Sequence, residues 1–461
     1  MNKNRINSKL FFVFLLFLQA GIIVAQKPSS DECNAKLVAF KELVQKAGDE
    51  KEIYIAWVSL KKNCATSDES IFVTGEQFLQ EKVLQANTSE EKNTIIQELV
   101  ALYDEHDKVF PANKRGNRIH KAILLYENNQ GTSGQIYSFL DQSFSTDESS
   151  FTSASVLNIY SKLIADQLKE GKLTSDEALE KLDKVYGKVQ SEHSKLTAEK
   201  NKFTTKQETA KLSAEETMAL KQVNNGLQEM KLVSKNIDGT VNSFSNCETL
   251  TAFYQKNFEK NSKNGLWLET AFERLNSKKC KSEFYLKVLE KWNEVAPTAK
   301  SSYNLALVAR QSKDRPKAIE YFLQSASFES DAVKKADIFY LVATTYGNAN
   351  KEKASEFAKK AIEANPASGK SYIFLAQLYS NSATECAKEN FDKKAIYWLA
   401  ASIAKQAGIV EPSLKKSADE LASGFNKLAP SKAEIAAANK KSGEKISYGC
   451  WINETVSIPK L

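Results

Sequence analysis

Histidine is scarce in this chain, and the patterns that mark catalytic or metal sites are missing. Of 461 residues only three are histidine, namely His106, His120 and His193. None of them belongs to an HExxH motif or to a closely spaced cysteine–histidine set. No GxSxG motif and no glycine-rich phosphate loop is present. The sequence therefore predicts no catalytic residue, no metal site and no cofactor.

Proline and glycine are also few, with 8 and 17 copies, whereas lysine, glutamate, alanine, leucine and serine are common. This balance is typical of a folded helical protein, and the length allows two or more domains. The formal net charge is +7, but the charges of both signs alternate along the chain and form no basic block. Because nucleic-acid binding needs a clustered basic face, the sequence predicts no nucleic-acid partner.

Long hydrophobic runs are limited to the N-terminus. Lys3, Arg5 and Lys9 precede an apolar core at residues 10–18, and small residues follow up to Ala25. This order predicts a secretory signal peptide over residues 1–25, cleaved after Ala25. An uncleaved anchor is the alternative, although the run is short for a membrane-spanning helix. No other stretch is apolar enough to span a membrane, so we expect no span after cleavage and an exported protein.

Six cysteines remain after cleavage, and an even number in an exported chain indicates disulfides. Helix geometry selects the first pair. Two apolar stripes with the same 4-3-4 spacing flank a Gly-Asp turn: Cys33, Leu37, Phe40 and Val44, then Ile53, Trp57, Leu60 and Cys64. In an antiparallel hairpin Cys33 faces Cys64, and a bond there closes about 31 residues and contributes roughly 3–4 kcal/mol. Two buried free thiols are the alternative.

The same design occurs again between Cys247 and Cys280, with Asn264-Gly265 as the turn. Once these four cysteines are paired, Cys386 and Cys450 remain. We therefore predict a third bond between Cys386 and Cys450, which holds the C-terminal tail on the preceding helices.

Residues 301–408 contain one two-helix pattern three times. The first helices read Ser302-x2-Leu305-Ala306-x2-Ala309, Ile338-x2-Leu341-Val342-x2-Thr345 and Tyr372-x2-Leu375-Ala376-x2-Tyr379. The second helices read Ala318-x3-Phe322, Ala354-x3-Ala358 and Ala395-x3-Leu399. The leading leucines are 36 and then 34 residues apart, which is the period of a helix–turn–helix solenoid. Three unrelated amphipathic helix pairs are the alternative interpretation.

The stretches KASEFAKKAIEANP (353–366) and AIEYFLQSA (318–326) resemble the tetratricopeptide repeat family. The resemblance covers about a quarter of the chain. It implies stacked helix pairs that bind peptides or protein surfaces along a concave face lined by the first helices.

On this basis we predict a protein-binding surface made of outward-facing residues of the three first helices. These residues are Tyr303, Leu307, Arg310, Phe339, Tyr346, Ile373, Gln377 and Asn381. Such a set favours an apolar or aromatic peptide over a strongly acidic one, because only Arg310 offers a fixed positive charge. Two alternatives stay open: the aromatic rings pack against neighbouring helices, or the protein's own tail with Trp451 fills the groove.

The predicted fold is all-α, a helix–turn–helix repeat solenoid in two helical domains with a short extended C-terminal tail. The expected boundaries are a signal peptide at 1–25, an N-terminal helical domain at 26–238, a tetratricopeptide-like domain at 239–445 and the tail at 446–461. Residues 237–246 are expected to form the linker between the two domains.

The predicted function is that of a non-enzymatic interaction scaffold in the periplasm or cell envelope of a Gram-negative bacterium. Its expected partners are other proteins or peptides of the envelope. The alternatives are a structural subunit of an envelope assembly, or a cell-wall hydrolase with a helical cleft. The hydrolase requires a buried acid or nucleophile, and the sequence offers no constellation of that kind.

Overall fold

The computed structural model describes residues 29–46, 49–112 and 115–460. Contacts along the chain divide it into two compact units, residues 1–167 and 168–461. The predicted signal peptide lies outside the described residues. The predicted domain boundary between residues 238 and 239 lies inside the second unit.

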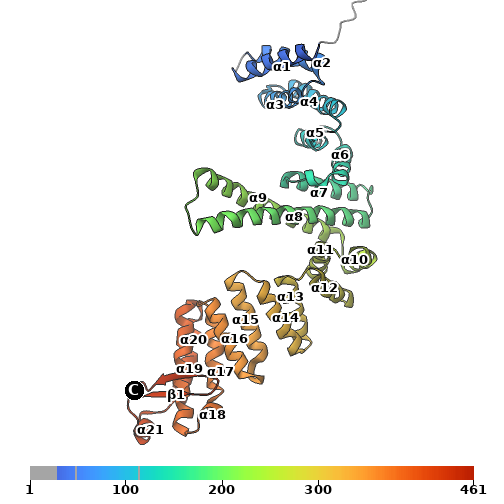
Figure 1. Cartoon of the computed structure of the whole chain (residues 1–461). Coiled ribbons are helices and arrows are strands. Elements are labelled where there is room, and N and C mark those ends of the chain that lie inside the picture. Colours follow the sequence, from blue (N-terminus) through green and yellow to red (C-terminus); the bar gives the residue numbers. More distant parts are fainter. Residues whose placement is uncertain (1–28, 47–48, 113–114, 461) are drawn as a thin grey trace, which may run out of the picture. The chain divides into compact units, whose positions relative to one another are not determined.

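The first unit consists of helices that pack against their neighbours in chain order (Figure 1). They are α1 (Ser30–Gln45), α2 (Glu50–Cys64), α3 (Ser70–Gln85), α4 (Ser89–Val109), α5 (Asn117–Glu127), α6 (Ser133–Thr146) and α7 (Ala154–Lys169).

The α1–α2 hairpin has the apolar seam that the 4-3-4 spacing predicts. Its buried members are Cys33, Leu37 and Phe40 on α1 and Trp57, Leu60 and Cys64 on α2. The seam continues into α3 and α4 as one hydrophobic core. The indole N–H of Trp57 donates to the carbonyl oxygen of Ile71 at 2.9 Å, so this buried ring also joins α2 to α3.

The second unit begins with two long antiparallel helices and continues with shorter helix pairs (Figure 1). Its elements are α8 (Ser175–Gln207), α9 (Ala214–Phe244), α10 (Cys247–Asn261), α11 (Gly265–Ser277), α12 (Glu283–Val295), α13 (Ala299–Gln311), α14 (Arg315–Phe328), α15 (Ala332–Tyr346), α16 (Lys351–Ala364), α17 (Gly369–Ser380), α18 (Ala383–Cys386), α19 (Asn390–Val410), α20 (Lys415–Leu428), α21 (Lys432–Ala437), β1 (Lys445–Tyr448) and β2 (Glu454–Ser457).

The predicted linker at 237–246 was wrong, because α9 continues to Phe244. The apolar stripe of α9 runs on through Val233, Ile237 and Val241, all of them buried, so packing extends the helix past Gly239. Gly239 itself is exposed and costs the helix only about 1 kcal/mol relative to alanine.

A buried polar cluster ties the long hairpin to the helices that follow. Tyr254 of α10 donates its hydroxyl to Asp183 of α8 at 2.8 Å. The Arg274 guanidinium of α11 lies 3.6 Å from Asp183 and pairs with Asp238 of α9. Burial raises the pKa of Asp183, although Arg274 opposes this shift. These bonds join α8 and α9 to α10 and α11, so a domain boundary at residue 238 would cut through a buried cluster.

The predicted helix pairs are present as α13–α14, α15–α16 and α17–α19, and α11–α12 forms a further pair before them. The first helices of these four pairs begin 34, 33 and 37 residues apart, at Gly265, Ala299, Ala332 and Gly369. The small residues expected to let helices approach are fully buried. They are Ala306, Ala318, Ala354, Ala376 and Ala395. The all-α repeat architecture is thus confirmed.

The C-terminal tail is extended, as predicted, and forms a two-stranded antiparallel hairpin in which Ile446 pairs with Val456. Both side chains are buried in the same core as the repeats. Tyr448 donates its hydroxyl to the carbonyl oxygen of Asp392 at 2.7 Å, and Lys359 binds Glu454 at 2.8 Å. The tail is therefore an integral part of the last repeats.

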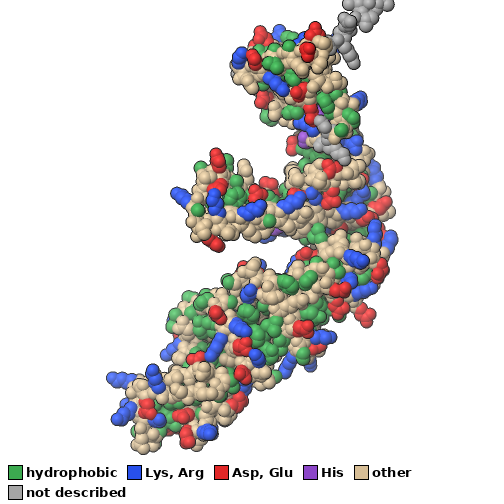
Figure 2. Space-filling view, viewed as in Figure 1, with side chains coloured by type: hydrophobic (Ala, Val, Ile, Leu, Met, Phe, Trp, Pro, Cys, Tyr) green, Lys and Arg blue, Asp and Glu red, His purple; other side chains and the backbone are tan. Residues whose placement is uncertain are grey.

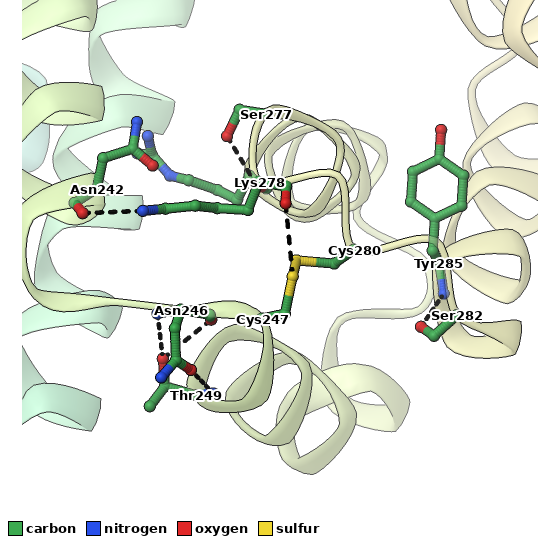
Figure 3. The surroundings of a disulfide bond; sticks show 10 residues. Asn242, Asn246, Cys247, Thr249, Ser277, Lys278, Cys280, Ser282 and Tyr285 are labelled. Atoms are coloured by element: carbon green, nitrogen blue, oxygen red, sulfur yellow. Dashed lines mark hydrogen bonds between the residues drawn. A yellow bond between two sulfur atoms is a disulfide. The ribbon is translucent and has the colours of Figure 1, made fainter.

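The structure contains the three predicted disulfides, Cys33–Cys64, Cys247–Cys280 and Cys386–Cys450, with Cα atoms 5.4–5.5 Å apart. Figure 3 shows the second bond, which joins Cys247 at the start of α10 to Cys280 in the turn between α11 and α12. Beside it the Lys278 ammonium donates to the carbonyl oxygen of Asn242 at 2.9 Å. Disulfides of this number are typical of proteins in oxidising compartments.

Candidate protein-binding site

The eight residues predicted to bind a partner lie on α13, α15 and α17 or at their ends, but they do not form one exposed surface. Leu307, Arg310, Gln377 and Asn381 are exposed. The other four, Tyr303, Phe339, Tyr346 and Ile373, are half-buried.

The three predicted aromatic residues pack against the second helix of their own pair. The ring centroid of Tyr303 lies 5.9 Å from that of Phe322 on α14. Phe339 and Tyr346 both lie beside Phe357 on α16, with centroids 6.0 and 5.9 Å away. These contacts hold the rings in place between the two helices of a pair, which is the packing alternative considered above. A role of these rings in binding stays a prediction.

A different aromatic pair joins successive first helices. Tyr340 of α15 and Phe374 of α17 meet edge to face, with ring centroids 6.1 Å apart. Both rings are half-buried. They therefore lie where the first helix of one pair contacts the first helix of the next.

An ion pair accompanies the two rings. The Lys370 ammonium lies 5.1 Å from the centroid of the Tyr340 ring and pairs with Asp337. The charges of Lys370 and Asp337 compensate each other. We call Asp337, Tyr340, Lys370 and Phe374 the aromatic patch. Hydrophobic side chains gather over α13, α15 and α17 in the space-filling view (Figure 2).

The sequence contains a signal for this patch. Tyr340 and Phe374 each stand directly before the leading leucine of their copy, Leu341 and Leu375. An aromatic residue thus occurs at the same repeat position in two consecutive copies. The predicted binding residues Phe339 and Ile373 occupy the neighbouring position, two residues before the leucine.

The C-terminal tail rests mainly on second helices of the array. It contacts Lys359 on α16, Asp392 on α19, and Tyr379 at the C-terminal end of α17, whose ring lies 5.7 Å from that of Trp451. The tail therefore covers a surface other than the aromatic patch, which lies nearer the start of α17.

None of the helices within the described ranges is long and apolar enough to cross a membrane. Over the same residues, no group of three or more histidine, cysteine, aspartate or glutamate side chains is placed to hold a metal ion.

The stacked pairs define the chain as an α-helical repeat protein. Among solved structures it is similar to yeast Tom70, with 10% sequence identity, a TM-score of 0.30 and coverage of 89% of this chain and 99% of that chain. It is also similar to the APC/C hetero-tetramer Cut9–Hcn1, with 10% identity, a TM-score of 0.26 and coverage of 86% and 76%. No family model and no curated protein matches the sequence.

Proposed function

We propose that this protein is a non-enzymatic scaffold that holds an apolar or aromatic segment of another protein on the aromatic patch. The observation that supports the proposal is the Tyr340–Phe374 pair, which extends over two successive first helices. Two large rings left half-buried at such a position offer apolar area without net charge. A partner segment that covers them gains hydrophobic and aromatic contact energy.

The place of action that we propose is the periplasm or envelope of a Gram-negative bacterium. The signal peptide expected at residues 1–25 supports export, and the three disulfides fit an oxidising compartment. Partners are then other envelope proteins or peptides.

The test is a double variant, Tyr340→Ala with Phe374→Ala, compared with Phe328→Ala as a matched control. Phe328 is an exposed aromatic residue at the end of α14, outside the aromatic patch. Binding of each variant to a partner captured from envelope extract and then purified is measured by titration calorimetry. Aromatic anchors of this kind contribute about 2 kcal/mol or more each, so we expect Kd to rise at least about 30-fold in the double variant.

Helical content is compared by circular dichroism so that loss of binding is separated from loss of folding. The proposal fails if the double variant keeps its helical content and still binds the partner as tightly as the parent. A second variant, Phe339→Ala with Tyr346→Ala, tests the residues predicted from the sequence. We expect it to lower stability, because both rings contact Phe357, and to change Kd little.

A further inference from the structure

Two adjoining cavities open on the first unit, between α3 and the N-terminal halves of α2 and α4, with Val44 of α1 at one side. Their volumes are about 420 Å³ and 480 Å³. They share Glu50, Lys82 and Gln85 in their linings, so they form one continuous depression. We call it the acidic groove.

The groove is negatively charged. Its lining contains four glutamates and one lysine: Glu50, Glu81, Glu91, Glu98 and Lys82. The Lys82 ammonium lies 3.5 Å from Glu50. The lining of the groove therefore has a formal net charge of −3, whereas the whole chain has a formal net charge of +7.

Two of these carboxylates accept hydrogen bonds from neutral donors, which orient them without compensating their charge. Glu98 accepts the hydroxyl of Tyr54 at 2.9 Å, and Glu91 accepts the backbone N–H of Asn87 at 3.1 Å. Burial and the bond to Glu98 raise the pKa of Tyr54 to about 12, so its hydroxyl stays a neutral donor.

The groove already holds one ammonium group in a defined way. The rings of Tyr54 and Phe78 are stacked, with centroids 5.8 Å apart. The Lys82 nitrogen lies 4.7 Å from the first centroid and 5.0 Å from the second. Ring faces and an adjacent carboxylate are the combination that attracts lysine and arginine side chains. Lys82 shows that this geometry accommodates a cation.

Large apolar side chains border the groove and are left in water. Leu84 is 86% exposed and lies one helical turn after Glu81, on the same side of α3. Val44, which lines the groove, is 36% exposed. A cation alone does not cover them, but a peptide with aliphatic residues next to its basic ones does.

We propose that the acidic groove binds a segment of another protein in which lysine or arginine alternates with aliphatic residues. The basic side chains pair with the carboxylates, and the aliphatic ones cover Leu84 and Val44. The excess negative charge repels nucleic acids and anionic lipid surfaces. This second interaction surface lies in the first unit and does not depend on the aromatic patch, which lies in the second.

The probe is a short fluorescent peptide in which lysines alternate with leucines, and its binding to the full mature chain is followed by anisotropy. Control peptides carry glutamate in place of each lysine, or serine in place of each leucine. We expect the lysine–leucine peptide to bind, and its affinity to fall as salt is added. At the same salt concentration, we expect both control peptides to bind more weakly than the lysine–leucine peptide. Equal binding of the serine peptide would show that a cation is sufficient and would overturn the proposed segment.

Charge variants locate the site. Glu81→Gln and Glu91→Gln are each expected to weaken binding about two- to five-fold, the range of one exposed ion pair. Lys82→Gln is expected to strengthen it by a similar factor, because the competing cation is removed. Glu90→Gln, on the exposed first turn of α4 outside the groove, is the matched control and leaves Kd unchanged.

The proposal is overturned if the Glu81→Gln, Glu91→Gln double variant binds the peptide like the parent, or if Lys82→Gln weakens binding. These side chains are not buried, so circular dichroism of each variant is expected to match the parent. The Tyr340→Ala, Phe374→Ala variant is expected to bind this peptide normally, which separates a failure here from a failure of the proposed function.

Discussion

The substitution Gly75→Ala sets two effects of opposite sign against each other. Gly75 lies in the middle of α3, where alanine is preferred over glycine by about 0.8–1.0 kcal/mol. A Cβ atom at this position, however, meets three atoms of the Trp57 ring at 2.4 Å. Real Cβ atoms do not approach other atoms so closely, so the ring or α3 must move.

The ring has little room to move. Trp57 is fully buried, and its N–H is bonded to Ile71, one turn before Gly75. Overpacking of a core costs typically 1–3 kcal/mol, and breaking a buried hydrogen bond costs about 1–3 kcal/mol more. These terms exceed the helix preference. We therefore expect Gly75→Ala to destabilise the first unit by about 1–5 kcal/mol.

Gly239→Ala is the matched control, because it is the same substitution inside a helix but without a neighbour. A Cβ atom on exposed Gly239 meets nothing within 4 Å. We expect it to stabilise α9 by about 0.5–1 kcal/mol. The two variants should thus change stability in opposite directions.

Hydrogen exchange followed by mass spectrometry measures each unit separately, which matters because a chain with two compact units need not unfold in one step. Exchange should accelerate in residues 50–85 of the Gly75→Ala protein and slow in residues 214–244 of the Gly239→Ala protein. If Gly75→Ala protects α3 as Gly239→Ala protects α9, the steric argument is wrong.

Two further variants test the disulfide-bonded tail and the buried polar cluster. Replacing Cys386 and Cys450 by serine should lower the free energy of unfolding by roughly 2–4 kcal/mol and speed hydrogen exchange in residues 445–457. Unchanged exchange in these residues would contradict the role given to this bond. Arg274→Ala leaves the carboxylate of Asp183 buried without its cation, so urea unfolding should show a decrease of about 3–5 kcal/mol in the free energy of unfolding. Adding Asp183→Asn should recover part of this decrease. A decrease below about 1 kcal/mol would show that the cluster is not tightly coupled.

The disulfides and the helix pairs could be predicted from the sequence because both depend on regular spacing. The 4-3-4 stripes place Cys33 opposite Cys64 whatever surrounds the hairpin. The recurrence of leucine and alanine likewise fixes the helix pairs, since each pair buries the same small residues against its neighbour.

The outward face of the first helices could not be predicted in the same way. α15 packs between α14 and α16, so residues on more than one side of it are buried. Apolar residues therefore occur around much of the helix, and the sequence does not show which of Phe339 and Tyr340 faces the second helix. That choice depends on the rotation of α15 about its axis, which its neighbours determine.

The end of α9 was missed for a related reason. Gly239 within a polar stretch is a local signal for a linker. Packing of Ile237 and Val241 overrides that signal, because an apolar stripe buried along a helix stabilises it more than one glycine destabilises it. Tertiary contacts therefore determine where α9 ends. The signal for this end in the sequence is that apolar residues continue at a spacing of three to four residues.

The connectivity of the disulfides bears on how the chain can be oxidised during its synthesis. All six cysteines lie in the part of the chain that the structure describes. In sequence order the first is bonded to the second, the third to the fourth and the fifth to the sixth, across 31, 33 and 64 residues. No bond encloses another. When the chain emerges with its N-terminus first, both cysteines of one pair are therefore present before the cysteines of the following pair appear. An oxidant that joins every new cysteine to the last unpaired one forms the native bonds without later exchange. Order of emergence alone thus selects one of the fifteen possible pairings.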